Sequence, residues 1–383
     1  MRLNPLFSSP DPGPRFCSTL GLLGLLLGLL APAVRADDWP QWLGPERDGV
    51  WRETGILERF PEQGPPIRWR TPVGGGYSGP AVAEGRVFVT DRVLPEGTSN
   101  PRNAFARSAT PGKERVLCLD EATGKVLWKH EYDCPYTVSY PAGPRATPVV
   151  HDGKVYTLGA MGDLLCLDVK TGKVLWSRNL PRDYEVPVPL WGFAAHPLLD
   201  GDKLICLVGG EGSVVVAFHK DTGKELWRAL SAAEPGYCPP MIYQVGGQRQ
   251  LIVWHPEAVN SLDPETGKVY WSEKFPVKAG LTIPTPRLLG NQLFLTCFYD
   301  GSLMLRLDPS TPRASVLWKS KVHSEQPNRT DYLHSIMCTP FLKDGHIYGV
   351  CSYGQLRCLK ADTGERLWET LDATGGKLER WAN

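Results

Sequence analysis

The sequence predicts an all-β fold, a β-propeller made of four-stranded antiparallel blades. A turn followed by a Trp recurs at intervals of 44 to 51 residues, and a proline-led apolar run precedes each copy. No segment shows the 3.6-residue apolar periodicity of a helix long enough for a repeated α/β unit. A period of about 45 residues with four short strands is the signature of one propeller blade. Six complete blades are visible in this way.

One well-defined copy shows how each element of the module is predicted. Strand A is the apolar run after Pro148, and the Asp152-Gly153 pair forms the tight turn to strand B. Strand C is "DLLCLD" (163–168), and strand D is "KVLW" (173–176). In the turn between strands C and D, an Asp is expected to bond backbone N–H groups and a Gly to supply the positive φ.

Strand D is the outermost strand of its blade, so its Trp is expected to cover the seam to a neighbouring blade. The residues given this structural role are Trp69, Trp128, Trp176, Trp227, Trp271, Trp318 and Trp368. The first of them belongs to "IRWRTPV" (67–73), which resembles a strand D without strands A to C before it. We therefore expect residues 67–73 to complete the last blade of the ring.

The N-terminus has the pattern of a secretory signal peptide. Arg2 and Arg15 precede the apolar run of residues 20–34, and cleavage is expected after Ala36. The run, of about 15 residues, is too short to span a bilayer comfortably, and an uncleaved anchor is the alternative. We expect a soluble periplasmic or extracellular protein without an integral membrane span after cleavage. The formal net charge of +1 provides no field that would attract nucleic acid.

The expected organisation has three parts. They are a signal peptide (1–36), an N-terminal extension that packs on the propeller (37–66), and the propeller itself (67–383). Within the propeller, residues 67–73 are the ring-closing strand, 77–376 the six repeats, and 377–383 the start of a further blade. Either the ring is unclosed in this chain or the sequence is truncated in the last blade. We expect truncation, because an open edge of apolar strands is an aggregation hazard.

Two sequence features carry a family resemblance, namely the repeated pattern LDxxTGKxLW and "WPQWLGPERDGV" (39–50). Together they resemble the pyrroloquinoline-quinone-like (PQQ-like) β-propeller repeat family, which includes quinoprotein dehydrogenases and the outer-membrane assembly lipoprotein BamB. The resemblance covers residues 39–383. It implies an exported propeller with seven or eight blades in the full ring.

The sequence does not carry over the chemistry that the resemblance implies for the dehydrogenases. Those enzymes stack the quinone on a disulfide between adjacent cysteines and hold Ca²⁺ with a Glu, an Asn and an Asp. This chain has no Cys-Cys dipeptide, and Cys17 precedes the apolar run, so it is no lipoprotein cysteine at the cleavage point. We expect no cofactor and no metal, and PQQ with Ca²⁺ only if the chain is a divergent enzyme.

Strand parity predicts which face of the propeller carries function. In a four-strand meander the A–B and C–D turns lie on one face, and the B–C and D–A connections lie on the other. The A–B and C–D turns are short and uniform in this chain. Every long connection is a B–C or a D–A connection, and we call the face that carries these connections the long-loop face. The long connections are residues 91–115, 132–146, 179–195 and 321–336. Variable loops on a rigid scaffold are where binding sites usually lie.

Residues just before each strand A approach the central axis on this face, and loop aromatics join them. The candidate residues for binding a ligand or partner are Tyr77, Arg145, Trp191, His196, Tyr237, Cys238, Tyr332 and His334. Tyr and Trp offer stacking faces with polar tips, and Arg can fix a carboxylate or a phosphate. The alternative interpretation is that the aromatics close the funnel and that His196 is simply buried.

No HExxH, paired CxxC, GxSxG or Walker motif is present, so no catalytic residue is assigned. The leading hypothesis is an exported, non-catalytic propeller that binds or scaffolds a protein or an extracellular ligand through its long-loop face. One alternative is a divergent periplasmic quinoprotein oxidoreductase, which rests on fold-level analogy. A second alternative, a carbohydrate-active or glycan-binding propeller, rests on the aromatic loops alone.

Overall fold

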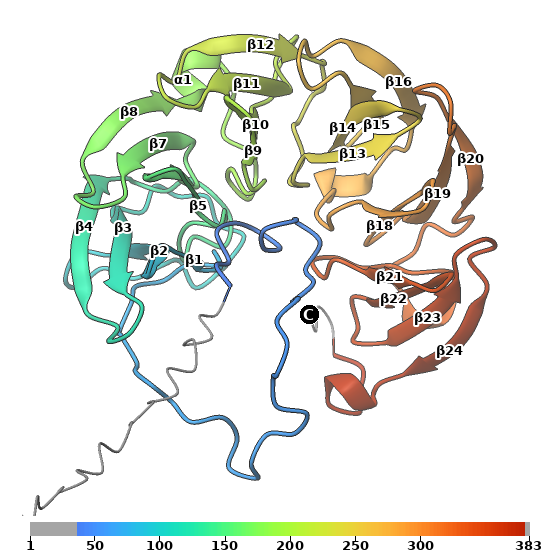
Figure 1. Cartoon of the computed structure of the whole chain (residues 1–383), viewed down its shortest axis with the longest axis horizontal. Coiled ribbons are helices and arrows are strands. Elements are labelled where there is room, and N and C mark those ends of the chain that lie inside the picture. The colour runs from blue at the N-terminus through green and yellow to red at the C-terminus, as the bar shows by residue number, and fades with distance from the viewer. Residues whose placement is uncertain (1–36, 380–383) are drawn as a thin grey trace, which may run out of the picture. The chain divides into compact units, whose positions relative to one another are not determined.

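The computed structural model describes residues 37–379, and these residues form six four-stranded antiparallel sheets. Each sheet follows the chain order of its strands, and Figure 1 shows the sheets succeeding one another around a common centre. The predicted all-β propeller with six complete blades is confirmed. The predicted signal peptide and residues 380–383 lie outside the described residues.

The first three blades take up the N-terminal half of the propeller. Blade one contains β1 (Ala81–Ala83), β2 (Arg86–Val93), β3 (Lys113–Asp120) and β4 (Val126–Asp133). Blade two contains β5 (Val149–His151), β6 (Lys154–Leu158), β7 (Asp163–Asp168) and β8 (Val174–Asn179). Blade three contains β9 (Leu198–Asp200), β10 (Lys203–Leu207), β11 (Val215–His219) and β12 (Glu225–Ala229).

The last three blades repeat the same order. Blade four contains β13 (Met241–Val245), β14 (Gln248–His255), β15 (Ala258–Leu262) and β16 (Val269–Lys274). Blade five contains β17 (Arg287–Leu289), β18 (Gln292–Cys297), β19 (Gly301–Leu307) and β20 (Ala314–Lys319). Blade six contains β21 (Phe341–Lys343), β22 (His346–Val350), β23 (Leu356–Lys360) and β24 (Arg366–Thr370). The helical segments are α1 (Leu180–Tyr184) and 3₁₀ turns at Lys278–Gly280, Pro327–Arg329 and Asp372–Thr374.

The repeated Trp joins one blade to the next along the chain. The indole of Trp128 donates to the Val169 carbonyl at 2.8 Å, and its ring lies over Gly172 in the C–D turn of blade two. A Cβ on Gly172 would lie 2.5 Å from that ring, and its φ of +69° also favours glycine. Asp168 caps the same turn, because its carboxylate accepts the Thr171 N–H at 2.8 Å. The turn therefore has the shape it needs to receive the preceding Trp.

The other repeat Trp residues follow this pattern with two departures. The indoles of Trp69, Trp176, Trp227 and Trp318 donate to the carbonyls of Glu121, Lys220, Pro264 and Ala361. Trp271 instead donates to Gln250 Oε1 of its own blade at 2.9 Å, and the next C–D turn lacks the Thr-Gly pair. Trp368 remains 44% exposed, because no blade follows it within residues 37–379.

Residues 67–73, expected to be a ring-closing strand, form no strand within the part of the chain that the structure describes. Their Trp69 nevertheless takes the place on blade one that the strand-D Trp of a preceding blade would take. Its indole bonds Glu121, its ring lies over Gly124, and Thr71 donates to the Gly124 carbonyl at 2.6 Å.

Residues 38–50, which we call the central segment, run along the inner side of the sheets and touch blades one to five. Figure 1 shows this segment in blue. Its hydrogen bonds join Trp39 to Val82, Pro40 to Val150, Arg47 to Pro197 and Pro240, and Asp48 to Arg287. It therefore lies over the start of several A strands, where candidate site residues had been expected to face a channel.

Candidate functional site: the long-loop face

The strand bounds separate the two classes of connection as strand parity predicts. Each A–B turn has two residues between its strands, and the C–D turns are also tight. The long connections lie between β2 and β3 and between the last strand of one blade and the first strand of the next. The long-loop face is therefore the irregular side of a regular scaffold.

A cleft of about 610 Å³ opens on the long-loop face at blades three, four and five. All of its lining residues belong to D–A or B–C connections: Leu190, Ala233, Glu234, Pro256, Glu257, residues 276–280 and Asp300. Its lining includes three carboxylates and one ammonium group, that of Lys278, which lies 4.6 Å from the centre of the Tyr299 ring. The cleft, which we call the acidic cleft, thus carries an excess of negative charge.

The carboxylates of the acidic cleft are held in different ways. Asp300 is buried, and its two oxygens accept the Lys278 backbone N–H at 2.8 Å and face His323 Nδ1 at 2.9 Å. Glu257 accepts the Ala233 N–H at 3.0 Å. Next to them, Ala279 has a φ of +59°, a left-handed conformation that costs a non-glycine residue about 1 kcal/mol. The floor of the cleft is therefore fixed, while Glu257 at its rim is exposed to solvent.

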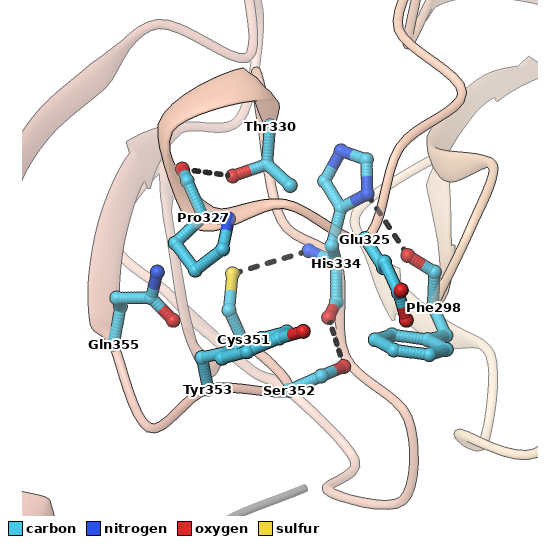
Figure 2. Close-up of a pocket in the computed structure, with 9 residues that line it drawn as sticks. All are labelled: Phe298, Glu325, Pro327, Thr330, His334, Cys351, Ser352, Tyr353 and Gln355. Atoms are coloured by element: carbon cyan, nitrogen blue, oxygen red, sulfur yellow. Dashed lines mark hydrogen bonds between the residues drawn. The ribbon is translucent and has the colours of Figure 1, made fainter. Parts of the chain in front are cut away.

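A second, smaller pocket lies between blades five and six, and Figure 2 shows its lining. It is formed by Phe298, Glu325, Pro327, Thr330, His334, Cys351, Ser352, Tyr353 and Gln355. These residues come from the D–A loop after β20 and from the B–C connections of the two blades. Its free volume, about 10 Å³, is the size of one water molecule or one ammonium group. We call it the interblade pocket.

Of the candidate residues, His334 lies in the interblade pocket and Tyr332 lies beside it at the blade seam. His334 is 1% exposed, and its ring nitrogens face the Phe298 carbonyl at 3.0 Å and Asp331 Oδ1 at 3.1 Å. Burial acts to raise the pKa of Asp331, but hydrogen bonds from His334, Ser320 and two backbone N–H groups lower it overall. Tyr332 packs on Trp318, with ring centres 4.7 Å apart.

Two more candidates, Trp191 and Tyr237, lie beside the acidic cleft. Their rings meet edge to face at 5.6 Å, and Trp191 follows the cleft residue Leu190 in the chain. Tyr237 is only 4% exposed, and burial raises its pKa. This aromatic pair supports the wall of the cleft and presents little surface of its own.

Tyr77 and Arg145 form a separate pair over blades one and two. The Arg145 guanidinium lies 5.2 Å from the centre of the Tyr77 ring, which is 52% exposed. The same guanidinium donates to the carbonyls of Ser139, Tyr140 and Gly143. Arg145 therefore organises the D–A loop between these blades, and the Tyr77 ring is its exposed cover.

His196 and Cys238 both lie close to Arg47 of the central segment and are covered by that segment. Trp42 stacks on the His196 ring at 4.0 Å with an interplanar angle of 4°, and Cys238 is 1% exposed. His196 Nδ1 accepts the Thr147 N–H at 2.8 Å. Burial and, to a smaller extent, the nearby Arg47 cation lower the pKa of His196 to about 3. Its imidazole is thus a neutral structural acceptor in the protein interior.

Blade one contains a buried carboxyl cluster that no sequence pattern indicated. Glu114 is 2% exposed and accepts hydrogen bonds from the hydroxyls of Tyr132 and Tyr136 and from the Ala160 N–H. Burial raises the pKa of Glu114, although these hydrogen bonds act in the opposite direction. Arg92 covers the Tyr136 ring at 4.0 Å. The cluster ties the D–A loop of blade one to blade two.

The described residues lack the disulfide between adjacent cysteines on which, by the resemblance, the quinone would stack. All nine cysteines in residues 37–379 are free thiols, and none is adjacent in sequence to another. Within the same range, no three His, Cys, Asp or Glu side chains are grouped so that they could hold a metal ion.

Comparison of the whole chain with known proteins identifies its family. The sequence model of the family described as "Outer membrane protein assembly factor BamB" matches residues 63–215 and 211–380. This chain belongs to that BamB-like family. None of the curated proteins compared with the BamB-like chain matches it.

Several solved structures resemble this BamB-like chain. BamB from Moraxella catarrhalis is 17% identical over 74% of this chain and 76% of that chain, with a TM-score of 0.45. Quinohemoprotein alcohol dehydrogenase from Comamonas testosteroni is 13% identical, with coverages of 89% and 74% and a TM-score of 0.47. A europium-containing methanol dehydrogenase is 13% identical, with coverages of 91% and 86% and a TM-score of 0.49. At these identities the likeness concerns the fold alone.

In this BamB-like chain, sequence reasoning located the face but missed most residues that line its hollows. Glu234, Glu257, Asp300 and Gln355 lie in short segments without a motif, so nothing in the sequence sets them apart. Among the helices of residues 37–379, none has the length and apolar character needed to traverse a bilayer.

Proposed function

We propose that this BamB-like protein is an exported, non-catalytic binding module whose long-loop face holds a partner protein in outer membrane protein assembly. The role in assembly is taken from the description of the family. The choice of face is supported by one observation: the acidic cleft and the interblade pocket are both lined only by B–C and D–A connections. Rigid blades with variable loops on one face are a common arrangement for binding.

The acidic cleft is the proposed docking point for the partner. Its volume and open form suit an extended chain segment, and Leu190, Pro256 and Val277 give it apolar walls. Its excess of carboxylates favours a segment that carries Lys or Arg, because complementary charge raises both specificity and association rate. We therefore expect a basic segment of the partner to lie across the cleft.

Site-specific photo-cross-linking in the native host tests the proposal. A benzophenone amino acid at Ala233, in the cleft, is expected to give an adduct with an outer membrane assembly component. The same amino acid at Ala122, an exposed position in the C–D turn of blade one, serves as the control and is expected to give none. An adduct from Ala122 alone, or an equal yield from both positions, would refute the choice of face.

The two alternative functions have direct tests. A quinoprotein oxidoreductase would reduce an electron-accepting dye when purified protein is supplied with PQQ, Ca²⁺ and an alcohol. A glycan-binding propeller would retain specific sugars on a glycan array. The proposal predicts neither result, and dye reduction that depends on added PQQ would replace it with the enzyme hypothesis.

A further inference from the structure

The interblade pocket contains a buried hydrogen-bond acceptor that no group in the described residues satisfies. Gln355 is 2% exposed, and its side-chain oxygen Oε1 has no partner there. Figure 2 shows the Gln355 amide directed towards the other lining residues. Burying an amide oxygen without a donor costs about 1–3 kcal/mol, so such an atom marks a place where a donor is missing.

Three other polar groups of the pocket hold its wall. Ser352 Oγ donates to the His334 carbonyl at 2.8 Å, and Cys351 Sγ accepts the His334 backbone N–H at 3.3 Å. Thr330 Oγ1 donates to the Pro327 carbonyl at 2.9 Å. The walls are thus fixed by internal hydrogen bonds, whereas the Gln355 oxygen is left facing the space between them.

The character of the pocket favours a cationic donor over a neutral one. The Glu325 carboxylate lines it, and the rings of Phe298 and Tyr353 supply aromatic surface. Aromatic faces and carboxylates both attract an ammonium group, most strongly where water is excluded. The one basic side chain in the lining is His334, and its ring is already held by Asp331 and the Phe298 carbonyl.

The size of the pocket selects among cations. Its volume of about 10 Å³ admits one ammonium-sized group, whereas the planar guanidinium of arginine, with three nitrogens around a central carbon, is larger. The pocket opens on the long-loop face, so a flexible aliphatic stem could pass out of it towards a bound protein.

We propose that the interblade pocket binds the ammonium head of a lysine side chain contributed by the partner protein. This inference rests on the proposed function, since it needs a partner on the long-loop face. The ammonium donates one hydrogen bond to Gln355 Oε1 and a charge-assisted one to Glu325. The acidic cleft and the interblade pocket then bind two basic parts of one partner.

Binding of a small probe tests the pocket itself. Butylammonium, which carries the head and stem of lysine, is titrated into protein with ¹⁵N-labelled glutamine, and the Gln355 amide signal is assigned from its loss in Gln355→Leu. A saturable shift of that signal is expected with butylammonium and none with 1-butanol. Butylguanidinium is expected to bind at least tenfold more weakly, because it does not fit.

Variants separate the roles of the two acceptors. Ligand-observed saturation transfer is expected to show about a tenfold weaker affinity for butylammonium in Glu325→Gln and loss of binding in Gln355→Leu. Gln355→Glu keeps an oxygen at this position and is expected to retain binding. No response to butylammonium, or an equal response to 1-butanol, would mean that the pocket holds only water and would overturn the proposal.

A stability measurement tests the unsatisfied oxygen independently of any ligand. Gln355→Leu is expected to leave the midpoint of urea unfolding unchanged or to raise it, because no hydrogen bond of Oε1 is lost. The control is Gln250→Leu, since the Gln250 oxygen accepts from Ser261 and Trp271, and this variant should lower the midpoint. An equal decrease in both variants would overturn the premise that the Gln355 oxygen lacks a partner.

The two proposals fail in different ways. Butylammonium binding without a cross-link from Ala233 would keep the pocket and refute the function. A cross-link without butylammonium binding would keep the function and refute the pocket.

Discussion

The environment of His196 predicts a loss of stability at mildly acidic pH. Its Nδ1 accepts the Thr147 N–H, so a proton on that nitrogen would place two donors against each other. Burial, helped by Arg47, lowers the pKa of the folded state to about 3, whereas an unfolded chain titrates at about 6.5. This contribution to stability is therefore present above pH 6.5 and is lost as the pH falls towards 3.

The size of the effect follows from these two pKa values. Between pH 7 and pH 5 the unfolded chain takes up roughly 0.7 of a proton at His196 and the folded chain takes up almost none. The free energy of unfolding should fall by about 2 kcal/mol from this residue alone. Other groups titrate in the same range, so the measurement needs a variant in which only His196 has been removed from the titration.

His196→Asn is that variant, because its side-chain oxygen can still accept the Thr147 N–H but does not titrate. Urea unfolding, followed by Trp fluorescence, gives the free energy of unfolding at pH 7 and pH 5 for both proteins. The wild type should lose about 2 kcal/mol more than the variant. His151→Asn, at the exposed last residue of β5, is the control and should behave like the wild type. An equal loss in wild type and His196→Asn would refute the buried neutral imidazole.

Three further predictions concern the packing between blades and the buried carboxyl group. Trp176→Phe removes the bond to the Lys220 carbonyl and should cost about 1–2 kcal/mol in urea unfolding, whereas Trp368→Phe, at an exposed site, should change stability by less than about 0.5 kcal/mol. Gly172→Ala places a Cβ 2.5 Å from the Trp128 ring and should lower the melting temperature by several degrees more than Gly201→Ala, which meets nothing within 4 Å. Burial raises the pKa of Glu114 in the folded state, so its contribution to stability is present below its unfolded pKa and is lost as the pH rises through its folded pKa. In Glu114→Gln the melting temperature should therefore change less with pH over this range.

Much of the fold could be predicted from the sequence because one short pattern is repeated. Strand C of blade two was predicted at 163–168, and β7 has those bounds. The turn residues Asp168 and Gly172 take the cap and the positive φ that were expected of them. Residues 67–73 differ, because a strand needs a partner and none lies beside them in the described chain.

The candidate site could be predicted only at the level of the face. Strand parity is a property of chain order, so it identifies the long-loop face without any side-chain information. Which side chains meet there depends on loop paths, and the central segment could not be foreseen to cover His196. Gln355 is recognisable only from the missing partner of its oxygen, which is a property of three-dimensional packing.

A comparison of charge reversals on the two faces tests whether the long-loop face binds the partner through its acidic cleft. The partner cross-linked at Ala233 is purified, and its dissociation constant is measured for wild type, for Glu234→Lys with Glu257→Lys, and for Glu121→Lys with Glu365→Lys in C–D turns. We expect at least a tenfold weaker affinity for the cleft pair and less than a twofold change for the turn pair. An unchanged affinity of the cleft pair, or a greater loss in the turn pair, would contradict it.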